Sequence, residues 1–343
     1  MTTWIVSAGA EGRDYTEFFY RFGMAFVGGK SQRAAMAKVA TGDTILLKRG
    51  IAEFLAVGTV VERNGHACGD GDKAWLRDFD GWDLGGYCYV DWHVAPQPEP
   101  ASGLRMGTIY QTTRAEHIAV SGKLLAAPVR PPASEPAPTR RVSDSAILAF
   151  LIREGLRVSA ADELTEALRR IRLLAEYYYE AGHKNGRWSD IREHETRTFL
   201  VIPLLLALGW AEQQLKIELP VKGGKVDIAC FDRSFRGNPA DVVALIETKG
   251  FSSGLDYAPK QAHAYAKHFT NCQSVLVTNG YCYKTYMRQN DETFGTNPSA
   301  YLNIVRPRNR YPLDPDNVDG AFEVLRWLLP KSLRAPGEVT PTS

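Results

Sequence analysis

The stretch KVDIACFDRSFRGNPADVVALIETK, residues 225–249, holds two apolar runs that predict consecutive β-strands, KVDIACF and VVALIETK. Side chains two residues apart in a strand point to the same face, so Glu247 and Lys249 share a face of the second strand. Asp227 lies inside the first apolar run. If the strands pair as a hairpin, the Asp227 carboxylate can lie beside Glu247, and two acids and a lysine converge.

Two carboxylates held close together repel each other, and each is costly to ionise unless a divalent cation lies between them. Magnesium suits such a site because it takes one or two carboxylates and fills its octahedron with water and phosphate oxygens. A lysine beside the ion can orient a water and neutralise charge on a phosphate under attack. The pattern predicts Mg²⁺-dependent phosphodiester hydrolysis. The alternative is that Glu247 and Lys249 form only a surface ion pair.

A predicted helix precedes these strands. In EHETRTFLVIPLLLALGW, residues 193–210, the spacing of Phe199, Ile202 and Leu206 marks one apolar face. Glu195 stands four residues before Phe199 on that face. An acid there is unusual, and it either has a partner or answers the helix dipole.

A second predicted helix, KQAHAYAKHF at 260–269, places Gln261 and Tyr265 one turn apart on one face. It is followed at 274–286 by SVLVTNGYCYKTY, which predicts a strand, an Asn-Gly turn and another strand.

These motifs together resemble the PD-(D/E)XK nucleases, especially the nuclease domain of type I restriction motor subunits. The resemblance spans about 192–287 and rests on five motifs in the family's order: a helical Glu followed by P-L-L-x-x-L-G-W, V-D-I, I-E-T-K, Q-x-x-x-Y and T-N-G. It implies a mixed sheet with helices on both sides. The implied site comprises the metal ligands Asp227 and Glu247, the catalytic Lys249, the supporting Glu195, and Gln261 with Tyr265, which position the phosphate backbone or the strands.

Length and composition leave room for a second domain. The chain has 343 residues, of which 44% are hydrophobic and 23% charged, as in ordinary globular proteins. It has no long apolar run and no signal-peptide pattern, so we expect a cytoplasmic protein without membrane contact. The five cysteines form no C-x-x-C pair. The GGKS at 28–31 lacks the glycine spacing of a phosphate loop, so no nucleotide cofactor is expected.

The first 127 residues predict a compact, mainly-β domain. Its motifs WIVSAGAEG, FVGG, GDTILLK and AVGTVV resemble the PUA-like superfamily, in particular EVE and YTH-like readers, which bind a flipped modified base between aromatic rings. The best candidates for such a pocket are Trp75 and Trp82, because their flanking residues are too polar for a core strand. Trp4 and Tyr15 are further candidates, although most aromatic residues of a small β domain lie in its core.

The remaining segments are predicted from composition and periodicity. The proline-rich stretch 128–142 predicts an extended linker, and 143–184 a helical connector whose apolar stripe includes Leu164, Leu168 and Ile171. The nuclease domain then occupies 185–332, and a disordered tail 333–343. The predicted class is α/β plus mainly-β: a PUA-like β-barrel domain followed by a PD-(D/E)XK mixed sheet flanked by helices.

The sequence thus predicts a modification-dependent, type IV-like restriction endonuclease. It would cleave double-stranded DNA that contains a modified base, with C5-modified cytosine the first guess, and would need Mg²⁺. The net charge of +2 requires that DNA bind to local basic patches. Because one site cuts one strand, a double-strand break suggests a homodimer. Two alternatives stay open: a nuclease on RNA or single-stranded DNA without modification dependence, and a non-catalytic nucleic-acid-binding subunit.

Overall fold

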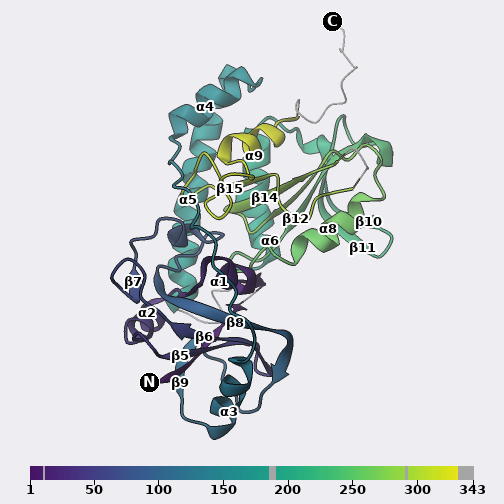
Figure 1. Ribbon diagram of the computed structural model, residues 1–343. Coiled ribbons are helices and arrows are strands. Elements are labelled where there is room, and N and C mark those ends of the chain that lie inside the picture. The colour runs from purple at the N-terminus through teal and green to yellow at the C-terminus, as the bar shows by residue number, and fades with distance from the viewer. Residues whose placement is uncertain (11, 185–190, 290–292, 331–343) are drawn as a thin grey trace, which may run out of the picture. The chain divides into compact units, whose positions relative to one another are not determined.

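The computed structural model describes residues 1–10, 12–184, 191–289 and 293–330 (Figure 1). The predicted tail, 333–343, lies outside the described residues. The chain divides into two units, Met1–Pro136 and Ala137–Ser343, and the division falls inside the proline-rich stretch. No helix in the described part of the chain is both long enough and apolar enough to span a bilayer.

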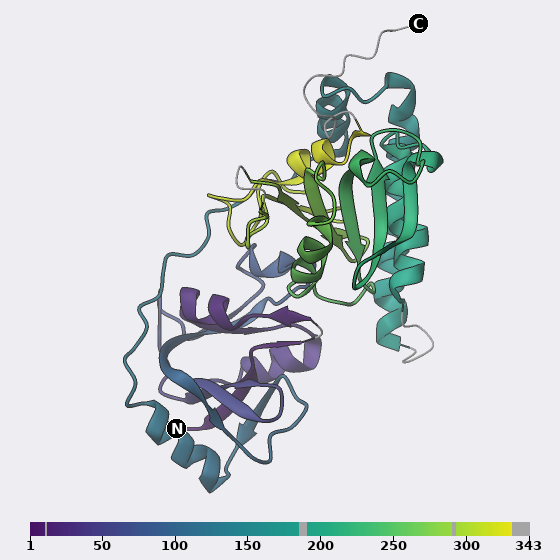
Figure 2. The same cartoon turned by 90° about the vertical axis from the view of Figure 1, so that its right-hand side faces the viewer.

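The first unit is built on a sheet that curls into a half-barrel (Figure 2). Its strand order is β4-β8-β6-β5-β1-β9, with β7 paired to β8. β1 and β5 pair in parallel, and the other pairs among the described strands of this sheet are antiparallel. The strands are β1 Thr3–Ser7, β4 Met24–Val27, β5 Thr44–Arg49, β6 Glu53–Val60, β7 Cys68–Asp70, β8 Gly86–Pro100 and β9 Ile109–Thr112.

Short elements close the half-barrel around an aromatic core. Phe19 of α1 packs edge-on to Phe26 of β4, with ring centroids 4.4 Å apart, and stacks on Trp92 of β8. Strands with large apolar residues on their inner face curl around such a core because the core can then be buried from several sides. The accessory elements are β2 Gly9–Ala10, β3 Arg13–Asp14, α1 Thr16–Phe22, α2 Lys30–Met36, η1 Leu76–Asp78 and α3 Ala115–Leu124.

The second unit contains a six-stranded mixed sheet with the order β10-β11-β12-β13-β14-β15. The predicted hairpin is present, because β11 and β12 pair antiparallel. The chain then crosses over through α8 so that β13 runs parallel to β12. The strands are β10 Leu215–Val221, β11 Gly224–Phe231, β12 Val242–Thr248, β13 Ser274–Thr278, β14 Cys282–Met287 and β15 Ala300–Asn303.

Helices cover this sheet on both sides, with α5 on one side and α8 on the other (Figures 1 and 2). The predicted stripe on α5 is buried at Leu164, Leu168 and Ile171, which is why this long helix docks stably. The helices are α4 Asp144–Arg153, α5 Ala161–Lys184, α6 Glu193–Thr196, α7 Ile202–Ala207, α8 Ala258–Ala266 and α9 Ala321–Trp327, with the short turns η2 Val158–Ala160, η5 Glu212–Gln214 and η6 Pro239–Asp241.

The predicted apolar face of the helix at 193–210 is wrong. Phe199 is 44% exposed, whereas Leu200, Leu204 and Leu208 are buried. Between α6 and α7 the chain forms a π-helical turn, η4 Arg197–Val201, which inserts an extra residue and rotates the following side chains. Because nearly every residue from 199 to 208 is apolar, periodicity alone could not choose the buried face.

Candidate active site

The hairpin of β11 and β12 positions the two predicted acids. Ile228 pairs with Ile246, and continuing the antiparallel register by one residue puts Asp227 opposite Glu247 on the same face. All seven residues of β12 are buried, and Glu247 is only 3% exposed. A carboxylate in such a strand needs compensating partners, because desolvation of an unpaired charge is strongly unfavourable.

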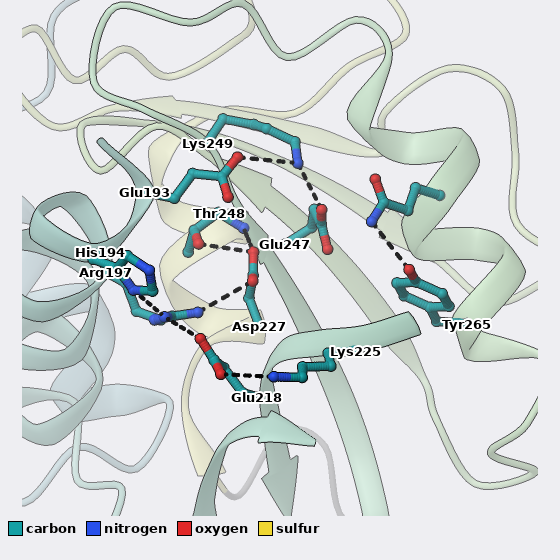
Figure 3. A network of polar contacts seen from close by, with 11 residues as sticks. Glu193, His194, Arg197, Glu218, Lys225, Asp227, Glu247, Thr248, Lys249 and Tyr265 are labelled. Atoms are coloured by element: carbon teal, nitrogen blue, oxygen red, sulfur yellow. Dashed lines mark hydrogen bonds and ion pairs between the residues drawn. The ribbon is translucent and has the colours of Figure 1, made fainter. Parts of the chain in front are cut away.

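Lys249 supplies that compensation just beyond the end of β12. Its Nζ lies 2.7 Å from Glu247 Oε1 and 3.5 Å from Glu193 Oε1 (Figure 3). Its backbone nitrogen donates to the carbonyl of Thr278 at 2.8 Å, which extends the pairing with β13 past the strand end. The lysine is therefore held from both its backbone and its side chain.

Asp227 has both carboxylate oxygens engaged. Oδ2 accepts hydrogen bonds from the backbone nitrogen of Thr248 at 2.7 Å and from its hydroxyl at 2.8 Å. Oδ1 accepts one from Arg197 Nη1 at 3.1 Å (Figure 3). These three bonds use both lone pairs of Oδ2 and one of Oδ1, so they orient the carboxylate and leave Oδ1 able to bind a cation.

Arg197 is a site residue that the sequence analysis did not identify. It lies at the start of the π-helical turn and is only 5% exposed. Besides Asp227, its guanidinium donates to His194 Nδ1 at 2.8 Å and to Glu218 Oε1 at 3.1 Å. In the sequence, Arg197 lies next to a long apolar run, which indicates that it can be buried. A buried arginine requires acidic partners, so this position could have been identified as a candidate.

The charges at the site shift the pKa values of its central pair. Burial raises the pKa of Glu247, the Asp227 charge raises it further, and Lys249 lowers it, with a net upward shift. Burial lowers the pKa of Lys249, but its hydrogen bond and charge attraction with Glu247 outweigh burial, so the pKa is raised. Lys249 is therefore a charged hydrogen-bond donor in this arrangement.

The described ion pairs place Glu193 of α6 against this cluster. Glu195, which the resemblance assigns to the metal site, accepts a hydrogen bond from the backbone nitrogen of Arg192 at 3.1 Å and so caps the first turn of α6. Among the hydrogen bonds and ion pairs of the described residues, none joins Glu195 to Asp227, Glu247 or Lys249. The cap explains why an acid stands at this position.

Gln261 and Tyr265 are linked on α8, with Gln261 Nε2 donating to Tyr265 Oη at 3.1 Å. The Tyr265 hydroxyl lies against the backbone of Gly224 at the start of β11, so closely that a Cβ on that glycine would clash with it. Tyr265 therefore packs against the start of the strand that carries Asp227.

A buried lysine, Lys284, lies on the same face of the sheet. Glu247 pairs with Val277, and Val277 pairs with Lys284, so the side chains of these three residues point the same way. Lys284 Nζ is 3.1 Å from Asp256 Oδ1, in the loop between β12 and α8. This pair ties the loop that follows Lys249 to the sheet.

The donor set fits a magnesium ion. Asp227 and Glu247 are the two carboxylates that can reach a shared cation, and the charge that each places on the other is what such an ion would relieve. Within the described residues no three His, Cys, Asp or Glu side chains are grouped for metal binding. An ion here would therefore complete its shell with water and phosphate oxygens, as magnesium commonly does.

The four aromatic candidates of the first unit lie mainly in its core. Trp4 is buried and donates to Asp43 Oδ2 at 2.9 Å, and Tyr15 is buried with its ring 4.8 Å from that of Phe79. Trp82 keeps a partly exposed ring, with the Arg13 guanidinium 3.8 Å from its centroid.

Trp75 is also buried, with its ring 4.7 Å from that of Phe22, despite its polar neighbours in the sequence. Those neighbours are accommodated because Trp75 precedes a short 3-10 turn rather than lying within a strand.

Comparison with known proteins gave no further guide. No family model matches this chain, and a search of curated proteins found no significant match.

Proposed function

We propose that the second unit is a Mg²⁺-dependent endonuclease and that the first unit directs it to double-stranded DNA containing a modified base. The observation that carries the proposal is the convergence of Asp227, Glu247 and Lys249 at the end of the central hairpin, with Lys249 Nζ 2.7 Å from Glu247. Two acids and a lysine held together on the central strands are suited to phosphodiester hydrolysis, because the charge of Asp227 disfavours that of Glu247 and a bound cation would relieve this repulsion.

In this proposal Asp227 and Glu247 would hold a magnesium ion, which would supply Lewis-acid polarisation of the phosphate and activation of a water. Lys249, kept charged by Glu247, donates to the phosphate oxygens and offsets the negative charge that grows during attack. Thr248 and Arg197 fix the Asp227 carboxylate through its two oxygens. The protein therefore supplies a preorganised set of charges, which is the main source of catalysis in phosphoryl chemistry.

The test is cleavage, with and without Mg²⁺, of matched duplexes carrying plain cytosine, 5-methylcytosine, 5-hydroxymethylcytosine or its glucosylated form. We expect that at least one of the modified duplexes is cut, that the duplex with plain cytosine is not, and that Asp227→Asn abolishes the cutting. Asp232→Asn is the matched control, because Asp232 follows the same strand but pairs with the exposed Arg233. Equal cutting of all four duplexes would refute modification dependence, and magnesium-dependent activity that survives Asp227→Asn would refute the assigned site.

A further inference from the structure

The proline-rich segment 128–136, here called the strap, is bound along the first unit. The backbone nitrogen of Arg130 donates to the carbonyl of Trp92 at 2.8 Å, and that of Ala133 to the carbonyl of Arg21 at 2.6 Å. The Arg130 guanidinium also pairs with Glu17 at 3.0 Å. Prolines favour this extended path, and the two backbone hydrogen bonds fix its register on the unit.

The strap places one carboxylate in a site with two donors. Glu135 Oε1 lies 2.6 Å from Lys73 Nζ, and Glu135 Oε2 accepts a hydrogen bond from Trp75 Nε1 at 3.2 Å. Glu135 is itself exposed, whereas the Lys73 side chain is only 12% exposed and Trp75 is buried. The donors therefore belong to the body of the unit, and the acceptor comes from its surface.

The two donors are held independently of Glu135. Lys73 Nζ lies 4.9 Å from the ring centroid of Tyr87 and 5.2 Å from that of Tyr89, so two rings of β8 face its charge. The Tyr87 hydroxyl donates to Asp72 at 2.8 Å, which fixes the chain next to Lys73. Trp75 packs on Phe22, with ring centroids 4.7 Å apart. None of these contacts involves the strap, so both donors are positioned by the body of the unit rather than by Glu135.

The composition of the strap region points to a competitor for this site. Glu135 is the single acid in 128–142, a stretch that also carries Arg130, Arg140 and Arg141. A basic segment favours association with a polyanion. Its one acid, Glu135, forms an ion pair with Lys73 of the folded unit. An ammonium and an indole N–H that each take one carboxylate oxygen can equally take two oxygens of a phosphodiester.

We propose that Lys73 and Trp75 form a binding site for a backbone phosphate of nucleic acid, and that Glu135 occupies it as an internal substitute in the free protein. Binding of the phosphate displaces Glu135 and loosens the strap. The identity of the ligand as duplex DNA rests on the proposed function, whereas the anion site itself rests only on the contacts of the first unit.

The experiment uses the full chain and compares wild type with Glu135→Gln, Lys73→Met and the control Glu99→Gln, which removes an acid that pairs with the exposed Lys123 at 2.7 Å. Fluorescence anisotropy measures affinity for a short duplex. Glu135→Gln should bind about fivefold more tightly, the scale of one partly exposed ion pair that no longer competes. Lys73→Met should bind more weakly, and Glu99→Gln should match wild type. Equal affinities for Glu135→Gln and Glu99→Gln would overturn the competition.

Hydrogen exchange at the amides of Arg130 and Ala133 supplies a second readout. Saturating duplex, or inorganic phosphate at high concentration, should accelerate exchange at these amides in wild type but not in Lys73→Met. Unchanged exchange with bound ligand would show that the strap is only a structural clamp. If no duplex binds but inorganic phosphate still accelerates exchange, the nuclease proposal fails while the anion site stands.

Discussion

Glu247 is the residue at which stability and the proposed activity conflict most directly. Its pKa is raised by burial and by Asp227, and only partly restored by Lys249, so its charged form is disfavoured in the folded state. A raised carboxyl pKa contributes stability that is fully present below the unfolded-state value, about 4.3, and is lost as pH rises through the folded-state value. Such a cost at neutral pH is typical of functional sites.

Glu247→Gln should therefore unfold at a higher temperature than wild type at pH 8 in the presence of EDTA. The difference should shrink as pH falls and vanish at about pH 3, below the unfolded-state pKa, where the wild-type carboxyl is protonated in both states. Thermal unfolding at several pH values measures this. Added Mg²⁺ should raise the unfolding temperature of wild type more than that of the variant. A variant less stable than wild type at pH 8 would contradict the assigned cost of this charge.

Removal of the Arg197 charge should destabilise the protein, in contrast to removal of the Glu247 charge, because Arg197 is a buried cation with two acidic partners. Arg197→Met leaves Asp227 without its guanidinium donor and should cost about 3 kcal/mol of unfolding free energy, as expected when one partner of a buried ion pair is removed. Arg197→Lys keeps the charge and should recover part of that loss. Urea unfolding gives both values. Since Asp227 then lacks a counter-charge, Mg²⁺ should stabilise Arg197→Met more than wild type, and equal stabilisation would contradict this electrostatic role.

The helical segment at 193–210, which precedes the sheet, is the element whose structure differs most from its prediction. Strand periodicity predicts that Glu247 and Lys249 share a face, and the hairpin then brings Asp227 opposite Glu247, so three residues of the site follow from local pattern and one pairing. The π-helical turn does not follow from periodicity, because it depends on which of many apolar side chains the sheet buries. Which of Glu193 and Glu195 faces Lys249 depends on the geometry of that helix, so periodicity could not predict it either.

Glu193→Ala and Glu195→Ala separate the two acids of α6. Glu193 lies 3.5 Å from Lys249 Nζ, so its loss should lower the cleavage rate by roughly tenfold, the scale of one electrostatic partner, with little change in stability. Glu195 caps the helix, so its loss should cost about 1 kcal/mol of stability while leaving the cleavage rate near that of wild type. Single-turnover cleavage and urea unfolding on both variants decide the matter. The reverse order would place Glu195 in the metal site.

At the scale of the whole molecule, composition locates the boundary between the units but not the path of the chain there. Five prolines between 128 and 138 exclude helix and predict an extended segment. They cannot indicate that this segment binds to the first unit, because its contacts are made by Trp92, Arg21 and Lys73, which are remote in sequence. Extension is a local property of the backbone, whereas docking depends on a surface that exists only after folding.

The number of active sites in one molecule determines how the proposed enzyme would cut the two strands of DNA. One chain presents one set of Asp227, Glu247 and Lys249, and in the proposed function one such set would hydrolyse one strand at a time. At low enzyme concentration, a supercoiled plasmid with the recognised modification should therefore accumulate as the nicked circle before it becomes linear. Raising the enzyme concentration should shorten this lag more than proportionally, because two copies must meet. Adding an excess of Asp227→Asn protein should prolong the nicked stage by pairing with active copies. Linear product that forms without a nicked intermediate at every enzyme concentration would indicate instead that a preassembled pair of sites makes the cut.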